Sequence, residues 1–211
     1  MIIGRMKKVV CFVLFWGILM SWLGCGALAD SNDVKIIKEA IKRSMDSLKP
    51  GDNEVSAEDY PLVKKLSIYP DEERPEDKKV VNIALIGKLT EVEELNLGAN
   101  NIIDLSPLAG LNKLTRLDFS LNKVADLSPL AGKNNLVIFN ATGNQIKDVS
   151  VLSGLTKLEV VYLSNNQISD ISPLLQLKSL KEVTLKGNKV SAADIGNLKK
   201  ALPKGCYFEH D

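Results

Sequence analysis

The protein has 211 residues, of which 45% are hydrophobic and 25% are charged; this fits one globular unit and is too short for two large domains. The formal net charge of the whole chain is +1, so the chain lacks the basic surplus that binding to nucleic acid requires. We therefore expect no nucleic-acid partner.

Residues 1–29 predict a cleaved export signal. Basic residues precede an uncharged apolar run over 9–24, and the segment 27–29 offers small residues at the spacing that a signal peptidase reads. The run has 16 residues, fewer than the roughly 20 that span a bilayer as a permanent helix. Cleavage leaves 24 basic and 26 acidic groups, a net charge of −2. We expect a secreted or periplasmic protein.

Cys25 gives the same segment a second interpretation. It follows Gly24 at the end of the apolar run, as the modified cysteine does in bacterial lipoprotein signals. Trp22 stands three positions earlier, where such signals carry an aliphatic residue, and this favours soluble release. The alternative is lipidation at Cys25 with an anchor at the cell envelope, and it is the one route by which we expect contact with a membrane.

Residues 30–53 are expected to form a helix and a linker. Apolar residues recur there at the spacing of one helical face, at Val34, Ile37, Ile41, Met45 and Leu48. Such a face must be buried against the structure that follows.

Residues 54–88 predict an atypical first repeat. Within the expected strand at 63–68, Leu66 and Ile68 precede their equivalents Leu95 and Leu97 by 29 residues, against a spacing of 22 in the later repeats. The extra seven residues lie in Pro70–Lys79. We interpret that stretch as a solvated loop, with a lip that contacts a partner as the alternative.

From 89 to 196 the sequence repeats every 22 residues. One unit is too small to bury its own apolar side chains, so successive coils must stack them into a continuous core. Alternation marks a short strand in each repeat. Its inward positions form two columns: Leu95, Leu117, Phe139, Val161 and Val183, then Leu97, Phe119, Ala141, Leu163 and Leu185.

An asparagine ladder is predicted beside the strands. A chain that turns out of a strand points backbone groups into the coil, away from water. A carboxamide donates and accepts hydrogen bonds, so stacked asparagines can satisfy these groups from repeat to repeat. The ladder consists of Asn100, Asn122, Asn144, Asn166 and Asn188.

The segments 104–108, 126–130 and 170–174 share the pattern Asp, aliphatic, Ser, Pro, Leu. A capping serine and a proline in the first turn predict short 3-10 or irregular turns on the convex side. Calcium binding by the aspartates is the alternative, without a liganding loop to favour it. Lys133 replaces a leucine of the sister repeats, and we expect its stem to pack while its ammonium reaches water.

Residues 197–211 are expected to form the C-terminal cap. A helix is predicted over 194–202, followed by a closing edge strand at 206–208. Cys206, the single cysteine left after cleavage, is expected to be a buried thiol of this cap. The alternative is a reactive thiol or an intermolecular disulfide.

The 22-residue period and the phrase NQISDISPL, from Asn166 to Leu174, resemble bacterial internalin-like leucine-rich-repeat proteins over roughly residues 33–211. The resemblance implies an α/β fold: a right-handed solenoid with a parallel concave sheet, an N-terminal cap helix within 30–53 and a C-terminal cap helix. It also implies a protein ligand on the concave face, without naming that ligand. We expect a monomer.

A partner-binding surface is predicted from strand alternation. Outward positions of three successive strands bring apolar and aromatic side chains together with a flanking charge pair, a composition common at interface centres. The alternative is that these residues only follow strand propensity. The predicted surface consists of Arg116, Asp118, Ile138, Asn140, Val160 and Tyr162.

No catalytic constellation is recognisable, and we expect a non-catalytic protein without metal or cofactor. The single histidine, His210, lies next to the last residue, so no catalytic triad or His-metal motif can be assembled on a rigid element. A carbohydrate hydrolase using Glu94, Asp118 or Glu182 is one alternative. A structural or wall-associated envelope component is another.

Overall fold

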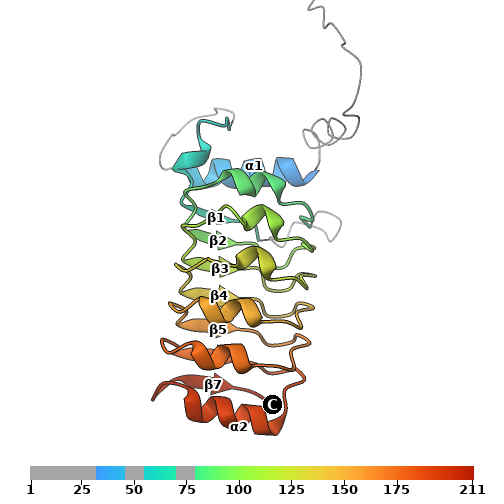
Figure 1. The fold of residues 1–211 in the computed structure, drawn as a ribbon. Helices are drawn as coiled ribbons and strands as arrows, with labels where there is room; N and C mark the ends of the chain where they lie inside the picture. Colours follow the sequence, from blue (N-terminus) through green and yellow to red (C-terminus); the bar gives the residue numbers. More distant parts are fainter. Residues whose placement is uncertain (1–31, 46–54, 70–78) are drawn as a thin grey trace, which may run out of the picture.

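The computed structural model describes residues 32–45, 55–69 and 79–211. Within them, seven three-residue strands lie side by side in one open parallel sheet, in chain order (Figure 1). This confirms the solenoid and the parallel concave sheet predicted from the repeats. The strands are β1 (Lys65–Ser67), β2 (Glu94–Asn96), β3 (Arg116–Asp118), β4 (Ile138–Asn140), β5 (Val160–Tyr162), β6 (Glu182–Thr184) and β7 (Tyr207–Glu209).

Short 3-10 turns lie opposite the sheet and connect successive strands from β1 to β6, and one more precedes β1. The register of the strands follows the 22-residue period, and Leu66 of β1 pairs with Leu95 of β2 despite their 29-residue separation. The predicted loop at 70–79 lies, except for Lys79, outside the described residues. The turns are η1 (Tyr60–Leu62), η3 (Ala84–Lys88), η4 (Ser106–Leu108), η5 (Ser128–Leu130), η6 (Ser150–Gly154) and η7 (Ser172–Gln176).

A helix covers each end of the stack (Figure 1). At the first end, α1 (Asn32–Met45) buries Ile37 and Ile41 completely. At the other end, α2 (Ala192–Ala201) begins at Ser191, whose hydroxyl accepts a hydrogen bond from the Asp194 amide. The predicted boundary between residues 196 and 197 therefore falls inside α2. Both cap helices are confirmed, and each shields apolar side chains that a terminal coil would leave exposed.

The core is one continuous stack of aliphatic side chains with two aromatic rings near its centre. Phe119 and Phe139 meet edge to face, with ring centroids 5.5 Å apart. At roughly 1.5 to 3 kcal/mol for each buried aliphatic side chain, this stack is the main favourable term that opposes chain entropy.

The five ladder asparagines connect neighbouring coils through shared carbonyl oxygens. Asn144 Oδ1 accepts from the Val124 amide at 2.9 Å, and its Nδ2 donates to the carbonyls of Phe119 and Ala141 at 3.0 and 3.1 Å. Asn122 also donates to the Phe119 carbonyl, at 2.9 Å. A carbonyl has two acceptor sites, so each such oxygen ties two successive asparagines together.

In η4 to η7 the first amide of the turn is bound by an aspartate two residues earlier, and serine does not cap the turn as expected. Asp104 Oδ1 accepts from the Ser106 amide at 2.7 Å, and the Ser106 hydroxyl donates to Asp104 Oδ2. The hydroxyl of Ser128 likewise donates to Asp126, and hydrogen bonds from Ser128 hold the pKa of Asp126 below its usual value. Aspartate takes this role because its two carboxylate oxygens can accept from both the backbone amide and the side-chain hydroxyl of the serine two residues later.

Lys133 is buried, and the expectation that its ammonium reaches water is wrong. The residue is 1% exposed, in the column where the other repeats place leucine. Its Nζ donates to the Ala109 carbonyl and to Asn112 Oδ1. Burial lowers the pKa of Lys133, because removal from water disfavours the charged form.

We predict that neighbouring ladder asparagines are energetically coupled. Asn144→Leu leaves the Val124 amide unpaired and should lower the free energy of unfolding by about 1 to 3 kcal/mol. Adding Asn122→Leu removes the second donor to the Phe119 carbonyl, so the two losses should not add. Denaturant unfolding of the single and double variants measures the coupling. The pair Asn122 and Asn166, which shares no carbonyl, is the control, and equal coupling in both pairs would contradict coupling through the shared carbonyl.

Lys133→Leu is predicted to raise the thermal midpoint at neutral pH. The substitution removes a desolvated cation, and its two acceptors belong to exposed residues that water can reach. The pKa of Lys133 is lower in the folded chain than its ordinary value of 10.5. As the pH rises toward 10.5, the folded chain loses this proton before the unfolded chain does, so the free energy of unfolding of the native protein increases. The advantage of leucine should therefore shrink on raising the pH. A difference that is constant between pH 7 and about 10 would argue against this account.

Candidate functional site

The six residues predicted to bind a partner lie together on three adjacent strands. Parallel pairing places Arg116 of β3 beside Ile138 of β4 and Ile138 beside Val160 of β5. The second row runs through Asp118, Asn140 and Tyr162 in the same register. We call these six residues the concave patch.

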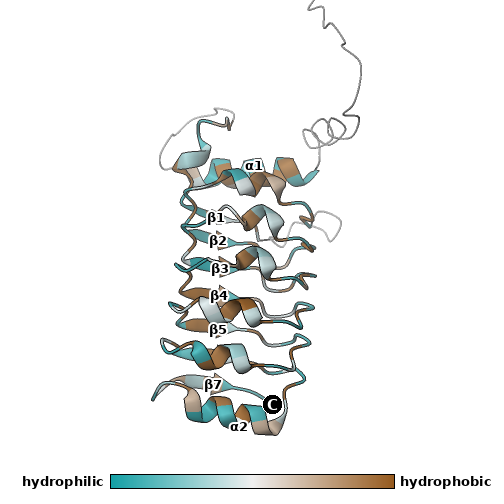
Figure 2. Ribbon diagram, viewed as in Figure 1, coloured by the Kyte–Doolittle hydropathy of each residue, from teal (hydrophilic) through white to brown (hydrophobic). Residues whose placement is uncertain are grey.

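The apolar part of the concave patch occupies the middle of the sheet. Figure 2 shows β4 and β5 as hydrophobic, whereas β1 to β3 are hydrophilic. Ile138, Val160 and Tyr162 are each half-buried, so part of every side chain remains accessible on the sheet. The arrangement is an apolar centre with polar strands beside it, which is how many protein interfaces are organised.

Tyr162 is affected by burial and by the neighbouring charges of Glu182 and Arg116. Partial burial raises the pKa of its hydroxyl, and the neighbouring Glu182 carboxylate raises it further. The charge of Arg116 acts in the opposite direction. Because the Tyr162 side chain is already half-buried, it loses less conformational freedom when a partner packs on it than a fully exposed side chain would.

Asp118 and Asn140 are engaged within the sheet. Asn140 Nδ2 donates to Asp118 Oδ2 at 2.8 Å, and Asp118 Oδ1 accepts from the amide and the hydroxyl of Ser120. Asn140 Oδ1 accepts from the Thr142 amide at 3.1 Å. Sequence reasoning missed this turn-forming role, although the signal was present: Asp or Asn followed two residues later by Ser, Thr or Gly.

The three carboxylates of the hydrolase alternative lie on three different strands. Glu94 on β2 forms an ion pair with Lys65 at 2.6 Å, and Glu182 on β6 lies near the Tyr162 hydroxyl, whose pKa it raises. Asp118 is bound to Asn140 and Ser120. Glycoside hydrolysis needs two carboxyl groups that face one bond, and here neighbouring side chains already engage Glu94 and Asp118.

Cys206, predicted to be a buried thiol of the C-terminal cap, is half-buried. Desolvation together with the charge of Glu182 raises the pKa of its thiol. Within 32–45, 55–69 and 79–211, no three His, Cys, Asp or Glu side chains are grouped so as to hold a metal ion. The same ranges contain no helix with the length and hydropathy of a membrane span. The predicted signal and Cys25 lie outside the described residues.

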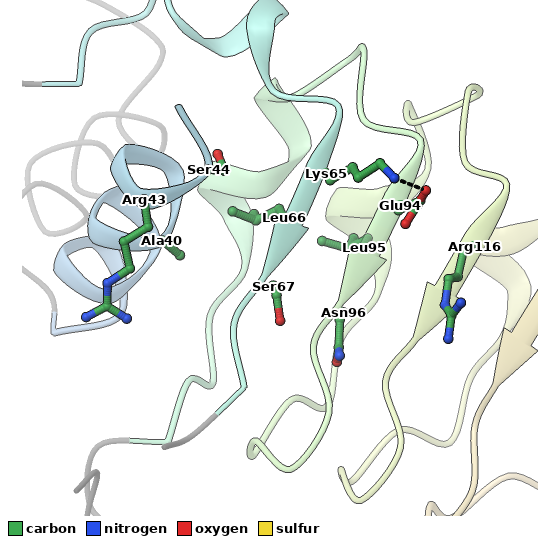
Figure 3. Close-up of a pocket in the computed structure, with 10 residues that line it drawn as sticks. All are labelled: Ala40, Arg43, Ser44, Lys65, Leu66, Ser67, Glu94, Leu95, Asn96 and Arg116. Atoms are coloured by element: carbon green, nitrogen blue, oxygen red, sulfur yellow. Dashed lines mark ion pairs between the residues drawn. The ribbon is translucent and has the colours of Figure 1, made fainter. Parts of the chain in front are cut away.

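A hollow of about 520 Å³ lies beside the concave patch, where α1 meets the first three strands (Figure 3). Arg43 of α1 and Arg116 of β3 line it together with Lys65, Ser67 and Asn96. We call it the N-terminal hollow. Sequence analysis did not find it, because Arg43 is brought to the sheet by the packing of α1 and not by the repeat.

A family model described as Leucine Rich repeats (2 copies) matches residues 90–132, 134–175 and 156–200, more than half of the chain. No curated protein sequence matches at a significant level. Among solved structures, the chain is similar to a Leptospira interrogans leucine-rich-repeat protein, with 25% identity and a TM-score of 0.63, over 72% of this chain and 38% of that one.

Two internalins of Listeria monocytogenes are also similar. Internalin inlF shows 26% identity and a TM-score of 0.62, and internalin C2 shows 25% and 0.55, each over 83% of this chain. The match spans 55% of the first internalin and 92% of the second. On the repeat model and this shared architecture, the chain belongs to the leucine-rich-repeat family and is internalin-like.

Proposed function

We propose that this chain is an exported, non-catalytic protein that binds another protein through its concave sheet. Solenoids of stacked repeats serve as interaction scaffolds because their extended surface can change without disturbing the core. The observation that carries the proposal is the concave patch, where Ile138, Val160 and Tyr162 present an apolar centre on an otherwise polar sheet.

The chemistry of the patch favours a protein partner over a carbohydrate. Branched aliphatic side chains beside a tyrosine and an arginine fit the apolar anchors of a protein surface. Arg116 is exposed and stands at the edge of the patch, where a charge can orient an approaching partner. Asp118 and Asn140 act mainly by fixing the strand ends, so we assign most of the binding energy to the other four residues.

Replacing Arg116 and Tyr162 by alanine is expected to reduce capture of the partner from the envelope fraction at least about tenfold. The thermal midpoint should move by no more than a few degrees, because neither side chain belongs to the core. Quantitative mass spectrometry of the captured proteins measures the effect.

Ile103→Ala and Lys123→Ala are the matched controls, because both residues are exposed and lie outside the strands. Unaltered capture by the Arg116 and Tyr162 variants would remove this face from consideration. Cosedimentation with wall material and no discrete partner would instead favour the structural envelope component.

Export is proposed from residues 1–29 alone, and it predicts a defined mature end. The protein recovered from the periplasm or the culture fluid should begin at Asp30, because the segment 27–29 carries the cleavage pattern. Intact-mass measurement reads this directly. A chain that begins at a lipid-modified Cys25 would replace soluble release by anchoring.

A further inference from the structure

The N-terminal hollow carries uncompensated positive charge. Of its three basic side chains, Lys65 is paired with Glu94 at 2.6 Å. Arg43 and Arg116 have no hydrogen bond or ion pair among the described residues. Figure 3 shows Ser67 and Asn96 between these two arginines. Ala40, Leu66 and Leu95 also line the hollow, so polar and apolar side chains lie between its two cationic flanks.

Asn96 offers hydrogen-bond donors into this hollow. Its Oδ1 accepts from the Gly98 amide at 3.0 Å, which fixes the orientation of the carboxamide. Its NH₂ group donates to no acceptor within the described chain, although it carries two hydrogens. Ser67, its neighbour in the register of β1 and β2, adds a hydroxyl.

Asn140 shows that an asparagine at this strand position can bind a carboxylate. Asn140 occupies the same strand position two repeats later, and its NH₂ group donates to the carboxylate of Asp118 on the preceding strand at 2.8 Å. For Asn96 the equivalent residue on the preceding strand is Ser67, which has no carboxylate. The same geometry at Asn96 thus suits a carboxylate that comes from another molecule.

We propose that the N-terminal hollow receives a carboxylate side chain of an acidic segment of the partner protein, bound by the Asn96 amide between Arg43 and Arg116. This rests on the proposed function and specifies the chemistry of the partner. Charge-assisted hydrogen bonds of guanidinium and carboxamide groups to carboxylate are stronger than neutral ones. The segment continues over Ile138 and Val160, which adjoin Arg116 in register.

A protein segment fits better than an anionic polymer. The cationic surface ends at Arg116, and the next strands present an apolar centre and then Glu182. A polymer with evenly spaced negative charges would meet no basic side chain at the apolar centre beyond Arg116. It would then be repelled by the Glu182 carboxylate. A segment with one or two acidic residues beside apolar ones complements this order of side chains.

The test uses a displayed library of random twelve-residue peptides, selected on the exported protein. Enriched peptides should carry Asp or Glu next to aliphatic or aromatic residues. Synthetic peptides from the selection are then measured by fluorescence anisotropy, each beside a twin with Gln or Asn in place of the acid. The twin should bind at least about tenfold more weakly, and binding of the parent should weaken with added salt.

Asn96→Asp is the decisive variant. It keeps the acceptor for the Gly98 amide, as Asp118 does for Ser120, but replaces the donors by a negative charge. Because Asp118 is the partner of residue 96 in register, the second carboxylate should lower the thermal midpoint by a few degrees at most. We expect at least about tenfold weaker peptide binding, with a similar loss for Arg43→Gln. Lys186→Gln, which removes an exposed cation from the turn after β6, should change the affinity less than about twofold.

Several results would overturn the proposal. Equal binding by Asn96→Asp, or by the uncharged twin peptides, would remove the carboxylate site. Polyphosphate that binds more tightly than the peptides, with the same dependence on Arg43, would assign the hollow to an anionic polymer. Capture of the natural partner that fails in Tyr162→Ala but persists in Asn96→Asp would refute the hollow and leave the concave patch standing.

Discussion

Each coil turns away from the sheet directly after a three-residue strand, and this turn forces backbone groups into the interior, where water cannot reach them. The asparagine ladder resolves that constraint. Because the Phe119 carbonyl binds both Asn122 and Asn144, each coil is closed partly by the next one. The repeats therefore stack with one fixed offset, and every other property of the molecule depends on that offset.

A fixed offset separates the residues that build the fold from those that can serve binding. Side chains at inward strand positions, such as Leu117 and Val161, are almost completely buried. These positions are therefore restricted to apolar residue types. Outward positions are limited only by strand geometry, which allows Arg116, Ile138 and Val160 to follow one another in a single row. The concave patch is thus free to match a partner without a cost to the core.

The ends of the stack require a different solution and create the least regular surface. A terminal coil has no neighbour, so α1 buries Ile37 and Ile41 against it. The same helix brings Arg43 to the edge of the sheet, opposite Arg116. A helix that stabilises the first coil therefore also forms one wall of the N-terminal hollow, beside the apolar centre where we place the partner.

The period of the sequence was sufficient to predict the solenoid, the strand register and the rows of the concave patch, because stacked repeats place residues 22 apart beside each other. It did not predict which acceptor each polar group takes. Aspartate and not serine binds the first amide of the convex turns, and Asp118 and Asn140 form a hydrogen bond with each other on the sheet. The Lys133 ammonium donates to the Ala109 carbonyl instead of to water. Those choices depend on distances between groups that only the folded chain brings together, as does the position of α1 beside the first strands.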